Sequence, residues 1–366
     1  MTASVALRLT ILVVLLGAIA AAAQPPKSSD RDVYQKIGRR FVVMDCGDVH
    51  CFRPLVAVVL EHLPGPSLLK WKAYAVLMIA ASAVAVARLC LLLGLSARAA
   101  GFATWIAAFG YGPLQSVFDP YTSDPLMYLL GPLLVADLLE NRLVRAGLVG
   151  CVGVLAKEFA AAPLWIYALF AALQRRWDTA VRVSLSALTA TLVWLTLQTT
   201  LMTLYNYRYG QNASVDLLGG GYLVAWARAL GPRLTAAYLF MAFGPLYVLL
   251  LPGLLRAGRS VRLLALSCLP AAAAFVYVQQ PDRALWNFHF IVIPIAVLVL
   301  VELPDWLCWL FVFSYGVANL RLGAPQPAIF PSIRLAMLAI SMALAAMAIA
   351  AASGRHRPHG PNRAWA

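Results

Sequence analysis

The sequence predicts an all-α polytopic membrane protein of about 12 transmembrane segments, with a large first outer loop that carries two interfacial helices. Of its 366 residues, 62% are apolar and only 12% are charged, whereas roughly 25% are charged in a typical soluble domain. The mean hydropathy is +0.79. Apolar segments of about 20 residues, the length of a helix that crosses a bilayer, recur from end to end.

The first apolar run covers residues 5–23 and ends in AIAAAAQ, which resembles a signal-peptide cleavage site. We expect this run to remain as an uncleaved first helix. The longest polar stretch, 24–70, follows as the first outer loop. The remaining apolar segments are 71–95, 100–117, 124–140, 144–156, 159–174, 180–203, 233–255, 262–278, 284–303, 306–320 and 333–352.

Two of these segments, 144–156 and 159–174, are short for a full crossing. They predict a hairpin of half-length or tilted helices around Lys157-Glu158. Residues 1–352 are expected to form a single transmembrane domain, in which 204–232 is a second outer loop. Residues 353–366 are expected to form a basic cytoplasmic tail.

Arginine placement predicts a cytoplasmic N-terminus. The expected inner loops then hold Arg98, Arg142, Arg145, Arg175, Arg176, Arg182, Arg256, Arg259 and Arg262. The first outer loop is also basic and the net charge is +14, which favours an anionic substrate at the outer face. A nucleic-acid partner is not expected, because no basic soluble domain with interleaved aromatic residues is present.

The first outer loop opens with SSDRDVYQKIGRRFVV, which predicts an amphipathic helix lying in the interface. Ser29 is expected to cap this helix, which would begin at Asp30. Two interpretations of Asp30 and Asp32 are open. They either complement the helix dipole, or one of them is a general base at the membrane surface.

The next stretch, MDCGDVHCFRP at 44–54, holds Cys46 and Cys51 with Asp48 and His50 between them. A metal knuckle, a disulfide-pinned loop and part of an active site all fit this composition. Pro54 predicts the first turn of a second short helix. The other cysteines lie in apolar segments and are expected to be small core residues.

Charged residues near membrane depth are costly and usually functional. Asp119 and Asp124 lie at the outer ends of two adjacent segments, and Asp124 either caps a helix or binds substrate. Lys157 and Glu158 form either an internal ion pair or a site in which Glu158 orients an ammonium that binds a lipid phosphate.

A later stretch, QQPDRALWNFHFIVIP, places Asp282, Arg283 and His289 at the outer start of another segment. Arg283 either pairs with Asp282 or clamps a phosphate through two donors. The loop 204–232 is rich in tyrosine and glycine, which suits a rim that stacks on a sugar. It also contains Asn212-Ala213-Ser214, which matches a glycosylation sequon.

The pattern resembles the GT-C class of integral-membrane glycosyltransferases. DRDVY, Asp30 to Tyr34, is similar to the acidic-x-x-x-Tyr signature of bacterial members. GDVHCFRPL resembles the Asp-x-His-x-x-x-Pro region of the protein O-mannosyltransferase-like branch. GVLAKEFAAAP resembles the Gly-x-x-x-Lys segment of many members, and DRALWNFHFIVIP resembles their late Arg-to-Pro helix. The usual adjacent Asp-Glu pair is replaced here by Asp30-Arg31-Asp32.

The resemblance implies transfer of a sugar from a polyprenyl-phosphate donor to a hydroxyl of a glycan, lipid or protein acceptor. Asp30 or Asp32 would be the catalytic base. Lys157 and Arg283 would stabilise the departing lipid phosphate, and Asp48, Asp119 and Asp124 would position the acceptor or a metal. The full set of implied substrate-binding residues is Tyr34, Asp48, His50, Arg53, Asp119, Asp124, Lys157, Glu158, Arg283 and His289.

No cofactor is required by this mechanism, although some members use a divalent cation. The implied location is the bacterial inner membrane, among membrane lipids, with the active site facing the periplasm. In that oxidising compartment a disulfide between Cys46 and Cys51 is expected to pin the joint between the two interfacial helices. Free thiols and a zinc site are the alternatives.

Three other functions compete with the transferase. A transporter or flippase of an anionic lipid-linked substrate would use the same charged residues, but no internal repeat is visible. A lipid-linked glycan polymerase or ligase would rely on arginine-rich outer loops more than on an early acidic motif. A non-catalytic scaffold gives no reason for separated charged sites on one face.

Overall fold

The computed structural model describes residues 3–27, 29–207, 232–275, 281–324 and 326–354, and within these ranges it is a bundle of helices without strands. The first half of the bundle contains α1 (Ala3–Ala22), α2 (Arg31–Arg40), η1 (Val49–Phe52), α3 (Pro54–His62), α4 (Ser67–Leu92), α5 (Ala97–Ala108), α6 (Tyr111–Phe118), α7 (Asp124–Leu139), α8 (Leu143–Gly153), η2 (Glu158–Ala161) and α9 (Ala162–Leu173). The second half contains α10 (Trp177–Tyr205), α12 (Pro232–Phe243), α13 (Pro245–Arg256), α14 (Arg259–Phe275), α15 (Pro281–Leu285), η4 (Trp286–Phe288), α16 (His289–Leu300), α17 (Asp305–Asn319) and α18 (Phe330–Ser353).

Within the described residues, the apolar segments predicted from the sequence are helical, but two of them are broken. The segment 100–117 is interrupted between α5 and α6 at Gly110, where a Cβ atom would lie 2.0 Å from the indole ring of Trp286. The segment 233–255 is bent by 103° between α12 and α13. Gly244 has a φ of +54° at this bend, and Pro245 has no backbone N–H with which to continue the first helix.

Five of the described helices are long and apolar enough to cross a membrane, or six if the bent pair of α12 and α13 counts as one span. The predicted number of about 12 is therefore not confirmed. The other apolar helices of the described chain are below the length of a full crossing, as α7 with 16 residues and α17 with 15 residues show. The short α8 and α9 on either side of Lys157-Glu158 do form the predicted pair of half-length helices.

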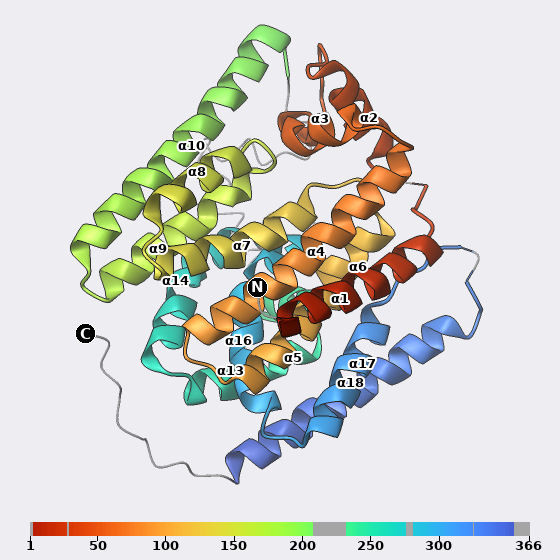
Figure 1. Ribbon diagram of the computed structural model, residues 1–366, viewed down its shortest axis with the longest axis vertical. Helices are drawn as coiled ribbons and strands as arrows, with labels where there is room; N and C mark the ends of the chain where they lie inside the picture. The colour runs from red at the N-terminus through yellow and green to blue at the C-terminus, as the bar shows by residue number, and fades with distance from the viewer. Residues whose placement is uncertain (1–2, 28, 208–231, 276–280, 325, 355–366) are drawn as a thin grey trace.

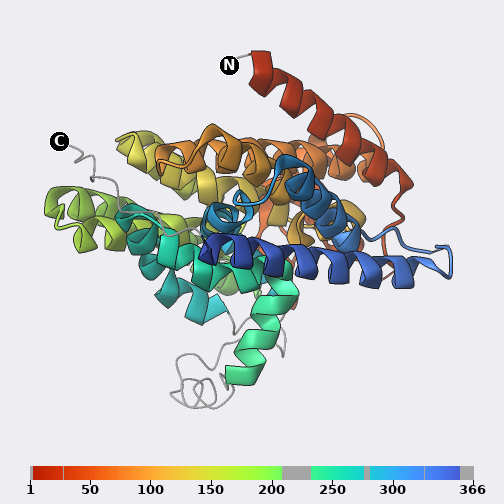
Figure 2. The ribbon, with the colours of Figure 1, turned by 90° about the horizontal axis from the view of Figure 1, so that it is seen from below.

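The long helices differ in how much of their surface the bundle covers. The span that includes α16 is 83% buried, and α4 packs at the centre against α1, α5 and α7. By contrast, only 17% of the span in α1 is buried, and Figure 2 shows this helix at the edge of the bundle. Apolar side chains on such uncovered faces, including Val14 of α1 and Leu188 of α10, are exposed. Uncovered apolar faces of this length are expected where helices contact lipid.

Charged residues gather at the two ends of α7. At one end, the C-termini of α4 and α7 meet the start of α8. There Arg88 donates to Asp137 at 3.1 Å and to Glu140 at 2.6 Å, and Arg142 and Arg145 pair with the same two carboxylates. These residues belong to the expected inner face. The other end carries the first loop, where α2 and α3 lie close to the start of α4 and the end of α10 (Figure 1).

The first loop contains two short helices, α2 and α3, as predicted, and Pro54 lies in the first turn of α3. The predicted cap at Ser29 is wrong. Asp30 occupies the N-cap position of α2 and makes no side-chain cap hydrogen bond, so its carboxylate remains available to other partners. The loop is tied to the end of α10, because the Asp45 backbone N–H donates to the carbonyl of Tyr205 at 3.1 Å.

Several sequence predictions lie outside the described residues. These are the sequon Asn212-Ala213-Ser214 and most of the loop 204–232, the side chain of Asp282, and the tail from residue 355 onward. The free cysteines of the described chain are Cys90, Cys268 and Cys308, which are buried, and Cys151, which is half-buried. This agrees with their prediction as small residues of the apolar segments.

Candidate functional site

Asp124, at the start of α7, is the centre of a buried ion-pair network at the end of the bundle that carries the first loop. Its Oδ1 accepts from the ammonium of Lys157, and its Oδ2 accepts from Nη2 of Arg283 at 2.6 Å and from Nε at 3.1 Å. The side chain of Asp124 is only 3% exposed. One carboxylate therefore holds two cations from distant parts of the chain, one after α8 and one in α15.

The Thr122 hydroxyl is part of the same network. It accepts from the backbone N–H of Asp124 at 3.2 Å and from Nη2 of Arg283 at 3.1 Å. Tyr74 of α4 contacts the start of α7. Its hydroxyl donates to the carbonyl of Ser123 and accepts from the backbone N–H of Leu126. Sequence reasoning missed Thr122. The only signal in PYTSDP was a hydroxyl before a helix start, which usually indicates a cap.

Arg53 and Glu158 form the second ion pair of the site. Nε of Arg53 donates to Oε2 of Glu158 at 3.1 Å, and its Nη2 donates to Oε1 at 2.6 Å. This bidentate geometry is the strongest that the two groups can adopt. Lys157 and Glu158 do not form the predicted internal pair with each other. The two neighbours turn to different partners, so that Glu158 fixes the first loop and Lys157 fixes the start of α7.

A third group in the first loop joins two carboxylates through a histidine. His50 Nδ1 is 2.6 Å from Asp48 Oδ1, and its Nε2 is 3.4 Å from Asp30 Oδ2. The hydrogen bond from the His50 ring lowers the pKa of Asp48. Asp32 points elsewhere, because its side chain is exposed on α2. The structure thus separates the two aspartates that the sequence left as alternatives.

Asp119 follows α6 and lies within electrostatic range of Asp30, Asp124, Arg283 and His50. Its Oδ1 is buried and has no hydrogen-bond partner among the described residues. Burial raises the pKa of Asp119 to about 6. A partly buried carboxyl with an unpaired oxygen suits an interaction with a group that the chain itself does not supply.

Aromatic side chains join the first loop to the rest of the site. The buried ring of Tyr34 packs against Trp71 with centroids 5.2 Å apart, and Trp71 packs against Tyr121 at 5.4 Å. The guanidinium of Arg31 lies 5.9 Å from the centroid of the Tyr121 ring. These contacts hold α2 against α4 and against the turn before α7, which keeps Asp30 close to Asp119.

Cys46 and Cys51 form a disulfide that closes the loop containing Asp48 and His50. His289 does not join the charged group. Its ring is buried and stacks on Trp286 with centroids 5.6 Å apart, its Nδ1 is 2.9 Å from the Trp286 carbonyl, and its Nε2 is 3.3 Å from the Ser82 hydroxyl. These contacts make His289 a core residue at the start of α16.

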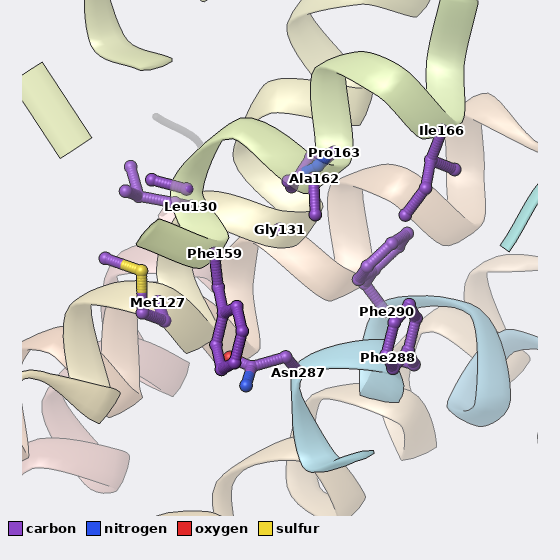
Figure 3. A pocket seen from close by; sticks show the side chains of 11 residues that line it. Met127, Leu130, Gly131, Phe159, Ala162, Pro163, Ile166, Asn287, Phe288 and Phe290 are labelled. Atoms are coloured by element: carbon purple, nitrogen blue, oxygen red, sulfur yellow. The ribbon is translucent and has the colours of Figure 1, made fainter. Parts of the chain in front are cut away.

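An apolar pocket lies beside the ion pairs, between α7, α9 and the start of α16 (Figure 3). It is small, with a cavity volume of about 20 Å³, and its lining includes Met127, Phe159, Pro163 and Phe290. The Phe159 ring connects the pocket to the charged group, since its centroid is 5.3 Å from the ammonium nitrogen of Lys157. A cavity of this size has room for about one water-sized group, so it is an apolar depression beside Lys157.

The described residues contain no group of three His, Cys, Asp or Glu side chains arranged to hold a metal ion. Asp124 and Glu158 are already paired with cations, and a divalent cation stays an expectation from the sequence. The chemistry of the site is that of three cations, Arg53, Lys157 and Arg283, around carboxylates and a histidine.

Comparison with solved structures identifies a fold. The Archaeoglobus fulgidus oligosaccharyltransferase in complex with Zn and sulfate matches with a TM-score of 0.50 and 14% sequence identity, over 96% of this chain and 54% of that chain. The chain shares that protein's fold. No family model matches the sequence, and no curated protein matches it.

Two further structures of the same archaeal oligosaccharyltransferase also match. The form tethered to an acceptor peptide has a TM-score of 0.49 and 14% identity over 97% of this chain, and the complex with an inhibitory peptide and a dolichol-phosphate has 0.48 and 13% over 97%. The chain spans about half the length of these proteins, 56% in both cases. The match at a TM-score of 0.50 agrees with the predicted GT-C-like fold, whereas the glycosyltransferase class and its O-mannosyltransferase-like branch stay predictions.

Proposed function

We propose that the chain is a membrane glycosyltransferase that moves a sugar from a polyprenyl-phosphate donor to an acceptor hydroxyl. The observation that carries this proposal is the position of Lys157, which lies between the carboxylate of Asp124 and the wall of an apolar pocket at Phe159. An amphiphilic donor with a phosphate and a hydrocarbon chain needs a cation and an apolar surface side by side. The fold shared with an oligosaccharyltransferase supports the same reaction class.

The proposed site faces the periplasm of a bacterial inner membrane. Its residues lie at the N-terminal end of α7, whereas the Arg88 network lies at the C-terminal end, and the arginines of the expected inner loops follow the positive-inside rule. The helix α2 carries a buried apolar face with Tyr34 and Ile37, and its Lys36 and Arg39 are exposed. The apolar face packs against α3 and against Trp71 of α4, and the proposal places the exposed basic face of α2 at the membrane surface.

Lys157 and Arg283 serve the leaving group in the proposed reaction. When the bond between the anomeric carbon and the phosphate oxygen breaks, negative charge grows on the lipid phosphate. Two fixed cations in a site of low dielectric stabilise this charge without having to reorganise. Asp124 keeps both side chains ionised and aimed at one point, because it accepts from each of them. Glu158 holds Arg53 nearby in the same way.

Asp30 is the proposed base, in preference to Asp32. It takes the proton of the acceptor hydroxyl while the hydroxyl oxygen forms its bond to the anomeric carbon, and polyprenyl phosphate leaves. Asp30 is 34% exposed and within reach of His50, so an acceptor from the aqueous side can approach it. Asp119, with its unpaired oxygen, is the proposed contact for a further hydroxyl of the sugar or the acceptor.

Binding of the lipid phosphate tests this function without knowledge of the sugar. The chain in lipid nanodiscs is offered a polyprenyl phosphate and, separately, the polyprenyl alcohol of the same length. We expect the phosphate to bind at least about tenfold more tightly, because hydrogen bonds to a charged group contribute roughly 1.5–3 kcal/mol. Lys157→Gln should remove most of that difference.

Lys36→Gln is the matched control, because Lys36 is exposed on α2 in the same half of the site. It should leave the affinity for both lipids within about twofold, since an exposed charge contributes little. Equal binding of the phosphate and the alcohol by the native chain would contradict the proposed donor class.

A further inference from the structure

The contacts of His50 go beyond what a substrate-binding residue requires. Asp48 holds both the ring and the backbone of His50, because its Oδ1 is 2.6 Å from Nδ1 and accepts from the backbone N–H at 2.8 Å. The second ring nitrogen, Nε2, is directed at Asp30 at 3.4 Å. The ring thus connects the proposed base to a second carboxylate.

The two nitrogens of His50 have different roles. The lowered pKa of Asp48, caused by the hydrogen bond from the His50 ring, keeps that carboxylate ionised. An ionised carboxylate can only accept, so Nδ1 carries the proton that it donates to Asp48. Nε2 is the ring atom that faces Asp30, 3.4 Å from its Oδ2. A proton delivered to Asp30 would be shared between these two atoms.

The surroundings of His50 hold its ring in this orientation. The disulfide between Cys46 and Cys51 closes the loop on both sides of Asp48 and His50. The buried ring of Tyr34 packs edge-on against the imidazole with centroids 5.3 Å apart. The charged groups that act on this loop from neighbouring elements are Asp119 and Arg53.

We propose that His50 is a positioning residue for Asp30 and that the His50 ring passes the proton of the acceptor hydroxyl from Asp30 to solvent. This inference rests on the proposed function. The acceptor O–H bond breaks as its oxygen bonds to the anomeric carbon, and the proton goes first to Asp30 and then to Nε2. The imidazolium is held between two carboxylates. The imidazolium then loses the proton to water, because the ring and both carboxylates are partly exposed. Asp30 is ionised again for the next turnover.

Sugar transfer by His50→Gln is the first arm of the test. Glutamine can still donate a hydrogen bond but cannot take up a proton, so we expect kcat to fall by about 10²-fold, with KM unchanged within about twofold. Asp48→Asn should lower kcat in the same direction. His62→Gln is the control, because His62 is exposed on α3 in the same loop. A rise in KM alone, or equal effects of both histidine substitutions, would overturn the relay.

¹⁵N-histidine NMR of the chain in nanodiscs is the second arm and requires no sugar. We expect Asp30→Asn to move the Nε2 resonance of His50 and Asp48→Asn to change its tautomer, while the resonances of His62 stay unchanged. If His50 responds to neither variant, the contact itself is disproved, whatever the transfer assay gives. If His50 responds as expected but the native chain transfers no sugar, the proposed function fails and the relay fails with it.

Discussion

Asp124→Asn is expected to destabilise the chain more than any other single change at the site, by about 3–5 kcal/mol. Asparagine keeps the shape of the side chain but removes the charge that Lys157 and Arg283 share. These cations are only 11% and 17% exposed, so the substitution leaves two largely buried charges without the carboxylate that neutralises them. The free energy of unfolding, measured in the same lipid or detergent for both chains, gives the size of the effect.

Asp178→Asn is the control for this prediction. Asp178 lies exposed in the first turn of α10, where loss of a carboxylate is expected to change stability by no more than about 0.5 kcal/mol. Lys157→Gln combined with Asp124→Asn should recover part of the lost stability, because it removes one of the two cations that Asp124 neutralises in the native chain. An Asp124→Asn chain as stable as the native protein would show that the network is solvated and contributes little.

Asp30→Asn is expected to have the largest effect on chemistry, with kcat reduced by about 10²–10⁴-fold. The amide cannot take the proton of the acceptor hydroxyl, and it leaves the contacts of Asp124 with Lys157 and Arg283 in place. Stability should change little, because Asp30 makes no cap hydrogen bond with α2. Single-turnover transfer, with donor bound in advance, measures the chemical step apart from binding.

Asp32→Asn is the matched comparison, two residues away on the same helix. Its side chain is exposed, so we expect kcat within about threefold of the native value. If Asp32→Asn were inactive and Asp30→Asn active, the base would be Asp32. The proton relay from Asp30 through His50 would then be disproved.

The helices of this fold follow directly from the sequence, because an apolar segment of sufficient length has few alternatives to a helix in a bilayer. Breaks inside such segments were harder to predict. Gly110 is a break because the ring of Trp286 occupies the space next to it, and that contact joins positions 176 residues apart in the chain. Length and composition alone predicted one continuous segment there.

Individual site residues were predicted better than their pairing. Lys157, Arg283 and Asp124 were each recognised as charges near membrane depth, but a distance of 159 residues along the chain separates Asp124 from Arg283. Their contact depends on how α7 and α15 pack, which no local pattern encodes. His289 shows the opposite error. A polar residue at the start of a span was interpreted as part of a site, whereas its ring packs in the core against Trp286.

The most direct test of the central proposal is transfer of labelled sugar by the purified native chain in lipid nanodiscs. A panel of polyprenyl-phosphate sugars is offered with peptide, glycan and lipid acceptors, and Asp30→Asn is run in parallel as the inactive reference. The proposal predicts that at least one donor is consumed, with release of polyprenyl phosphate and a glycosylated acceptor, and that Asp30→Asn abolishes both. Transfer that continues undiminished in Asp30→Asn would contradict it.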